Sequence, residues 1–173
     1  MKRFTVPLLF ALLTFCVGII GYRFFGCNSG PVNDSWATYL NEEYGYRLRY
    51  PNSWKVWDRP GTLYLCSPRI KFPCGPTPHE VYATVAVEIR DPEGLELSDY
   101  LQSPARGYKN LREVQIGGVK ALATGPVGGN FGRFIDEQVH ILRGGRVYVI
   151  TAYAVDSCPT DFERVLTTFE FTK

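Results

Sequence analysis

The chain has 173 residues, of which 45% are hydrophobic and 21% charged, a composition typical of a globular protein with one domain. Lys and Arg number 19 against 17 Asp and Glu, and Lys2, Arg3 and Arg23 lie within the first 30 residues, which hold no acid. The rest of the chain therefore has 16 basic and 17 acidic residues, a net charge of about −1, which argues against non-specific binding to nucleic acid through a broad basic surface.

The N-terminal residues form a long apolar segment. Lys2 and Arg3 precede residues 5–22, a run of eighteen residues without a charge. At about 1.5 Å per residue, a helix of this length nearly spans a hydrocarbon core of roughly 30 Å. The basic residues before the run favour a cytoplasmic N-terminus. We therefore expect residues 1–27 to be a signal or membrane anchor in the cytoplasmic membrane, with the domain on the extracytoplasmic side, periplasmic or extracellular.

The end of this segment leaves two forms of attachment open. The stretch FFGC ends in Gly26 and Cys27 and resembles the lipobox of bacterial lipoproteins. Phe24 and Phe25 stand where that motif prefers a small aliphatic residue and a small one, and Arg23 interrupts the apolar approach to it. We expect an uncleaved single-span anchor, with a lipid on Cys27 as the alternative.

The cysteines outside the apolar run bear on the same question, because an exported chain lies in an oxidising compartment. Cys66 and Cys74 flank the short Pro-bounded stretch SPRIKFP and are the first choice for a disulfide. Cys158 is then free or paired with Cys27. The alternative is a set of buried free thiols. No C-x-x-C occurs, so neither a redox motif nor a structural zinc site is supported.

Residues 28–35 read as a polar spacer, and the domain is expected over residues 36–173. In YGYRLRY, Tyr44, Tyr46, Leu48 and Tyr50 alternate with Gly45, Arg47 and Arg49, the period of a half-buried strand. Pro51 cannot donate to a strand ladder, so the chain should turn there and bring Trp54 back into the same core. VYATVAVEI, residues 81–89, is the next predicted strand.

Two hairpins follow, each with a two-residue glycine turn. Gly117–Gly118 would pair Ile116 with Val119 and Val114 with Ala121. Gly144–Gly145 would pair Ile141 with Tyr148, Val139 with Ile150 and Ile135 with Ala154. In both hairpins these pairs place apolar residues on one face, so turn and pattern agree.

Helices are few and short. Ser98 is expected to cap a turn that ends before Pro104, and Thr160 with Glu163 forms a capping box at the start of a second helix. TTFEF can return as a final strand. The fold class predicted is α+β, with a central antiparallel sheet flanked by a few short helices.

The stretch YGYRLRYPNSW after WATYLNEE, the hairpin HILRGGRVYVITAYA, and the closing helix into TTFEF resemble the PsbP-like family. This family includes the extrinsic photosystem PsbP proteins and many bacterial envelope proteins. The resemblance covers residues 36–173 and implies an α/β/α sandwich around a central antiparallel sheet. It also implies a protein that is not an enzyme. No ion site of the family can be matched residue by residue, so none is carried over.

The residues that could form a site lie on the polar face of the hairpin at 134–154. The pairing sets Asp136, Gln138 and His140 opposite Tyr153, Thr151 and Val149, and such a cluster on a rigid sheet can line a recognition groove. The competing interpretation is an ordinary solvated sheet face. His79, the other histidine, is expected in a solvated loop.

These observations give two hypotheses. The first is a membrane-tethered, non-catalytic envelope domain that binds or helps to assemble a partner protein or complex, with no cofactor and no metal. The alternative is an envelope protein that binds a small ligand or metal through Asp136, Gln138, His140, Thr151 and Tyr153.

Overall fold

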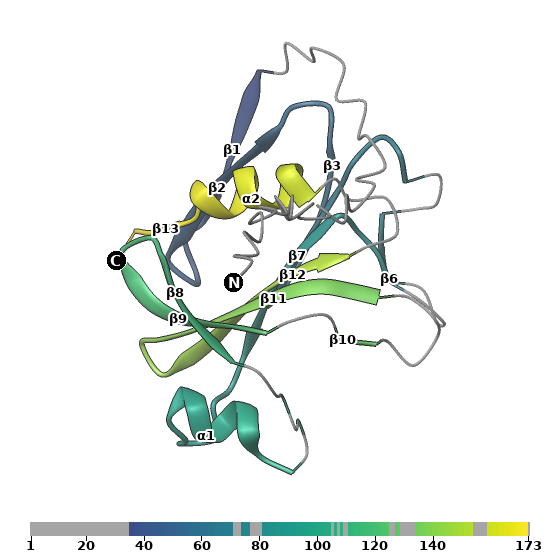
Figure 1. Ribbon diagram of the computed structural model, residues 1–173. Helices are drawn as coiled ribbons and strands as arrows, with labels where there is room; N and C mark the ends of the chain where they lie inside the picture. The colour runs from purple at the N-terminus through teal and green to yellow at the C-terminus, as the bar shows by residue number, and fades with distance from the viewer. Residues whose placement is uncertain are drawn as a thin grey trace, which may run out of the picture. The chain divides into compact units, whose positions relative to one another are not determined.

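The structure, a computed structural model, describes residues 35–70, 74–76, 81–104, 106, 108, 111–124, 127–128, 134–153 and 159–172. Most of these residues belong to antiparallel strands, which form an eight-stranded, a three-stranded and a two-stranded sheet (Figure 1). Residues 1–34, with the predicted anchor, Cys27 and the spacer, lie outside the described residues, as do His79 and Cys158. No helix in the described part of the chain is long and apolar enough to cross a membrane.

The largest sheet supplies one wall of the main core. Its neighbouring strands are, in order, β3 (Lys55–Arg59), β4 (Thr62–Cys66), β7 (Val85–Arg90), β12 (Arg146–Tyr153), β11 (Phe134–Arg143), β9 (Val119–Thr124) and β8 (Arg112–Ile116), and β10 (Val127–Gly128) also pairs with β11. The second sheet has the order β1 (Trp36–Asn41), β2 (Tyr46–Pro51) and β13 (Glu170–Phe171). The third joins β5 (Gly75–Pro76) to β6 (Val81–Tyr82).

The two helices lie on opposite sides of the large sheet (Figure 1). The helix α1 (Leu97–Gln102) packs on one face, against Val147 and Val149. The helix α2 (Pro159–Thr167) and the three-stranded sheet share the core on the other face. The α+β class and the antiparallel pairing are therefore as predicted, and the second sheet is an addition to the single central sheet that was expected.

The strand β2 joins the three-stranded sheet to this core. Tyr46 and Leu48 are buried while Arg47 and Arg49 are exposed, which confirms the predicted alternation. The chain turns after Pro51 and Trp54 is buried in the same core. The Tyr46 ring stacks on Phe169 at a centroid distance of 5.3 Å and meets Tyr148 of β12 edge-on at 6.1 Å. Aromatic rings thus connect the two sheets.

The β8–β9 hairpin has the predicted register, with Ile116 opposite Val119 and Val114 opposite Ala121. Gly117 and Gly118 form its turn with φ of +56° and +76°, a conformation that glycine adopts without strain. A Cβ on Gly117 would also lie 2.9 Å from the backbone oxygen of Phe169. The turn therefore packs directly on the C-terminal segment, and only glycine leaves room for that contact.

The β11–β12 hairpin follows the prediction near its turn and departs from it at the far end. Ile141 pairs with Tyr148 and Val139 with Ile150, as expected. Ile135, however, lies opposite Tyr153 rather than Ala154, because the register shifts between Ile135 and Glu137. A bulge adds one residue to one strand, so pairs counted from the turn are wrong beyond it.

Three local predictions are corrected. The expected strand over residues 81–89 is interrupted at Ala83–Thr84, where the Thr84 hydroxyl accepts a hydrogen bond from the Ser67 amide at 2.8 Å. Ser98 lies inside α1, whose N-cap is Glu96 and makes no side-chain capping bond. The helix α2 begins at Pro159, before the expected cap Thr160, because proline is favoured in the first helical position, where no amide is needed.

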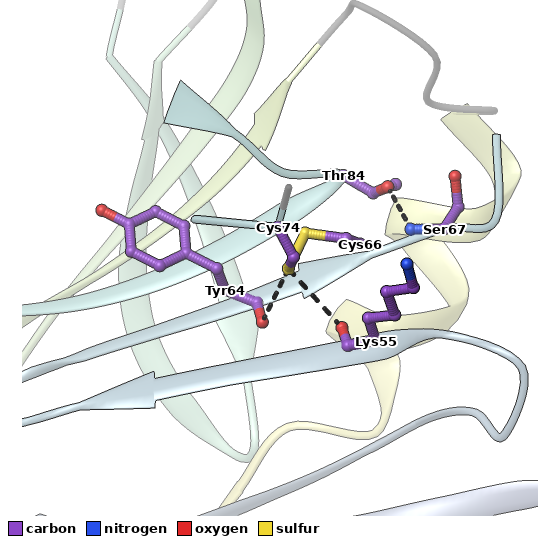
Figure 2. Close-up of a disulfide and its surroundings, with 6 residues drawn as sticks. All are labelled: Lys55, Tyr64, Cys66, Ser67, Cys74 and Thr84. Carbon is purple, nitrogen blue, oxygen red and sulfur yellow. Dashed lines mark hydrogen bonds between the residues drawn. A yellow bond between two sulfur atoms is a disulfide. The ribbon is translucent and has the colours of Figure 1, made fainter. Parts of the chain in front are cut away.

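The predicted disulfide between Cys66 and Cys74 is present, with the two Cα atoms 5.8 Å apart (Figure 2). It connects the end of β4 to β5 and packs with Trp57, Tyr64 and Ile70. The Cys74 sulfur lies 3.8 Å from the Lys55 oxygen and 3.9 Å from the Tyr64 oxygen. A disulfide sulfur has no proton to donate, so these are packing contacts that place the bridge against the edge of the sheet.

Removal of this disulfide should destabilise the domain, because the bridge restricts the unfolded chain. For the short loop that it closes, the double substitution Cys66→Ala/Cys74→Ala should lower the free energy of unfolding by about 2 to 3 kcal/mol. Denaturant titrations with and without a reducing agent provide the measurement. Reduction should lower the denaturation midpoint of the parent and leave that of the double variant unchanged. An unchanged midpoint for the parent on reduction would contradict the prediction.

Candidate functional site

The predicted polar face of the β11–β12 hairpin is the face that α1 covers. Gln138 lies opposite Thr151 and His140 opposite Val149, as the turn register predicts. On the next strand, β7, Glu88 pairs with Val149, which places its side chain on the same face. Asp136 falls at the bulge and is not opposite Tyr153, and its side chain lies outside the described residues.

This face is closed to solvent where the two central residues lie. Gln138 is 5% exposed and His140 is 0% exposed, and Thr151 is fully buried between them and β7. The cover consists of Tyr100 and Leu101 of α1, with Tyr108 beside them. The expectation of a solvated face or an open groove is therefore wrong for these residues. The sequence pattern shows which residues share a face, but it does not show that α1 packs over that face.

Arg106 holds the cover in place. Its guanidinium lies 3.7 Å from the centre of the Tyr100 ring, a cation–π contact. It also forms an ion pair with Glu93 at 2.8 Å. Farther along the chain, the Tyr108 amide donates a hydrogen bond to the Leu101 oxygen. The segment that follows α1 is thus tied back onto the helix.

Gln138 organises a short chain of hydrogen bonds beneath the cover. The Tyr108 hydroxyl donates to Gln138 Oε1 at 2.8 Å, and Gln138 Nε2 donates to Thr151 Oγ1 at 3.2 Å. Two of the predicted binding side chains, Gln138 and Thr151, therefore already bond to each other inside the protein. Such a network fixes the position of Tyr108 over the sheet.

His140 is different, because neither ring nitrogen has a hydrogen-bond partner among the described residues. Its ring lies against that of Tyr108, with the centroids 5.1 Å apart. The hydroxyl of Tyr100, in the helix above, is likewise buried and has no hydrogen-bond partner within the described part of the chain, although the Arg106 guanidinium lies against its ring. A buried polar atom without a partner costs about 1 to 3 kcal/mol, and natural proteins commonly satisfy such atoms with ordered water or a ligand.

An ion pair lies on β7, two strands away from the buried histidine. Arg90 and Glu88, both on β7, form an ion pair at 2.7 Å and are partly exposed. Burial, and then the positive charge of Arg90, lowers the pKa of His140 from 6.5 to about 4. Burial and the Glu88 carboxylate raise the pKa of Tyr153 above its ordinary value. Around neutral pH this face therefore holds the neutral imidazole of His140 and the neutral phenol of Tyr153, and the described residues add the Glu88–Arg90 ion pair.

The unpartnered atoms offer hydrogen bonds to a small polar molecule. A neutral imidazole presents one donor and one acceptor, and the Tyr100 hydroxyl can act as either. In the described part of the chain, no three His, Cys, Asp or Glu side chains lie close enough to hold a metal. The sequence interpretation missed Glu88, Arg90, Tyr100 and Tyr108. The alternation of Ala86, Glu88 and Arg90 in β7 was the signal that could have placed Glu88 and Arg90 on this face.

The buried state of His140 should make stability depend on pH. Its pKa is lower in the folded chain than in the unfolded chain, so the contribution is complete above pH 6.5 and is lost as the pH falls toward 4. Relative to His140→Phe, which cannot take up a proton, the parent should lose up to about 3 kcal/mol of unfolding free energy over this range. Denaturant titrations of both chains at several pH values test this, and parallel pH profiles would contradict it.

Comparisons with known proteins address the fold. No protein-family model and no curated protein matches the chain. A crystal structure from Bacteroides thetaiotaomicron VPI-5482 is similar, with a TM-score of 0.50 and 14% identity over 79% of this chain and 48% of that chain. This chain thus spans about half of the Bacteroides chain.

Two further solved structures are similar at lower TM-scores. The solution structure of a cyanobacterial PsbP from Synechocystis sp. PCC 6803 has a TM-score of 0.48 and 16% identity, over 80% of this chain and 93% of that chain. The crystal structure of the Saccharomyces cerevisiae Ran-binding protein Mog1p has a TM-score of 0.42 and 9% identity, over 81% of this chain and 97% of that chain. At identities of this size, likeness to solved structures concerns the fold alone, and the PsbP-like family stays a resemblance of the sequence.

Proposed function

We propose that this chain is a membrane-tethered, non-catalytic envelope domain that binds a partner protein or helps to assemble a complex. The tether is the uncharged run at residues 5–22 with Lys2 and Arg3 before it. The Cys66–Cys74 disulfide supports the extracytoplasmic side, because such bridges persist in oxidising compartments.

The observation that carries the binding function is the edge strand β1. Its sequence WATYLN has no charged residue and no proline. In the described sheets β1 pairs only with β2, so its second edge has no strand beside it. Natural proteins protect such edges with charges, and β3 and β8 at the ends of the large sheet do carry them. An uncharged edge strand is a surface to which a partner can add a strand.

Side-chain hydrogen bonds hold the edge strand, and one of its exposed side chains is apolar. The Tyr39 hydroxyl donates to Asp58 Oδ2 of β3 at 2.8 Å and accepts from Asn41 Nδ2 at 3.1 Å. Burial and the bond to Asp58 raise the pKa of Tyr39 to about 12, so its phenol keeps its proton. Beside it Leu40 is 51% exposed, an apolar side chain at the free edge. A fixed strand loses little conformational freedom on binding, which favours affinity.

A photo-reactive amino acid at Leu40 should cross-link the full chain to a partner protein in membranes of the source cells. The same amino acid at Leu95, which is 39% exposed and lies ahead of α1, is the matched control. We expect a reproducible adduct from position 40 and none from position 95, read by mass spectrometry. Recovery of the chain alone from both positions would count against the proposed function.

The second candidate function is the binding of a small ligand beneath α1. The unpartnered nitrogens of His140 favour it, together with the unpartnered Tyr100 hydroxyl. For a metal ion, the other ligand of this hypothesis, His140 is the one histidine among the described residues that can donate a ring nitrogen. That Asp136 and Tyr153 belong to such a site stays a prediction from the sequence.

Thermal-shift screening of the full chain with divalent ions, sugars and short peptides tests this second function. A ligand that bonds to His140 should raise the melting temperature of the parent, while His140→Phe, which keeps a ring of similar size, should not respond. Gln138→Leu tests whether the neighbouring network takes part. A hit that stabilises the His140→Phe chain as much as the parent would exclude the buried histidine as its site.

A further inference from the structure

The outer face of the three-stranded sheet carries a hollow that the two functions above do not use. It has a volume of about 400 Å³, within the range of small binding sites. Arg47 and Arg49 of β2 project into it from the face opposite the core. Its other lining residues are Thr38, Thr167, Thr168 and Glu170. The lining is thus made of guanidinium groups, hydroxyl groups and one carboxylate.

The charges of this hollow are not balanced. Arg47 donates through Nε and Nη2 to the same oxygen of Glu170, at 2.8 and 2.5 Å. No described carboxylate lies within ion-pair distance of Arg49. Two arginines at alternate positions of one strand repel each other, and Glu170 neutralises only one of them. The hollow keeps about one positive charge on a domain whose net charge is about −1.

The groups around Arg49 leave its guanidinium as the main unused donor. The Thr168 hydroxyl accepts from the Arg49 amide and donates to the Val165 oxygen, and the Thr167 hydroxyl donates to the Arg164 oxygen. The carbonyls at the end of α2, which would repel an anion, thus accept hydrogen bonds from the chain itself. Thr38 of β1 pairs with Arg49 across the strands and is itself exposed.

The hollow also adjoins the free edge of β1. A strand added to that edge would lie about 5 Å from β1 and about 10 Å from β2. Its outward side chains would alternate along the same face as Thr38 and Leu40. A glutamate on the added strand and the long side chain of Arg49 could together cover that distance, so an acidic side chain would meet a cation there.

We propose that the hollow at Thr38, Arg47 and Arg49 binds the carboxylates of an extended acidic segment of the partner protein, which pairs with the edge of β1. This inference rests on the proposed partner-binding function and adds the chemistry of the partner. Charge complementarity selects the segment, and the ladder of β1 aligns it. Glu170 competes with the incoming carboxylate for Arg47 and so weakens binding.

Two blocked peptides provide the probes, EVEVEVE and its uncharged match QVQVQVQ, titrated into the full chain in a non-ionic detergent. The acidic peptide should bind more tightly than the uncharged one, and its affinity should fall as salt is raised. Arg49→Gln should weaken EVEVEVE binding about tenfold and leave QVQVQVQ binding unchanged. The affinity of Arg49→Lys for EVEVEVE should lie between those of the parent and Arg49→Gln.

Glu170→Gln gives the sharpest test, because it breaks an ion pair and yet should strengthen binding. Freed from its partner, Arg47 should raise the affinity for EVEVEVE about threefold. Arg47 and Glu170 are 55% and 51% exposed, so the substitution should hardly change the melting temperature. Arg112→Gln, which removes an exposed arginine paired with Glu137 on the large sheet, is the control and should change neither peptide's affinity.

The outcomes separate this inference from the function on which it rests. The inference of an acidic partner segment would be overturned if the two peptides bound equally, or if Arg49→Gln left the binding of EVEVEVE unchanged. The cross-link at Leu40 would then still support partner binding. Binding to phosphatidylglycerol vesicles that requires Arg49, with no peptide binding, would assign the hollow to lipid and overturn the inference. A salt-sensitive preference for EVEVEVE that follows Arg49 and Glu170 as described supports it.

Discussion

The contact of Tyr46 with Phe169 and Tyr148 is the interaction on which the other features depend. It joins a sheet of three short strands to a sheet of eight. The three-stranded sheet is too small to have much core of its own. The Tyr148 hydroxyl adds a hydrogen bond of 2.7 Å to the Tyr44 oxygen, at the turn that leads into β2. The position of β1, and with it the free edge, therefore follows from aromatic packing one strand away.

The β11–β12 hairpin is covered on both faces, and the two covers differ in chemistry. On the face toward the aromatic contact, Val139, Ile141 and Ile150 pack in an apolar core. On the other face, α1 closes over His140 and Gln138, which are polar. Gln138 is satisfied by neighbours and His140 is not. The unpartnered imidazole nitrogens lower the free energy gained when α1 packs over them. This helix has six residues and no side-chain cap.

What could be predicted from the sequence was local and periodic. The glycine pairs fixed the register of two hairpins near their turns, and the alternation in β2 separated Tyr46 and Leu48 from the two arginines. The bulge at Asp136 and the break at Thr84 could not be predicted, because a single inserted residue leaves the apolar pattern intact on either side. The burial of His140 depends on where α1 packs, and the pattern of apolar residues does not predict that position.

The hollow at Arg47 and Arg49 shows how distant segments set the charge of one surface. The turn at Gly117 packs on the Phe169 oxygen, and a Cβ there would push that backbone away. Phe169 precedes Glu170, whose strand pairs with β2 at Arg47. The hairpin of the large sheet thus helps to hold the carboxylate that neutralises Arg47. Beside Arg49 the chain places Thr168, which precedes β13 and carries no charge. The unbalanced charge is therefore a consequence of the uncharged residue that precedes the last strand.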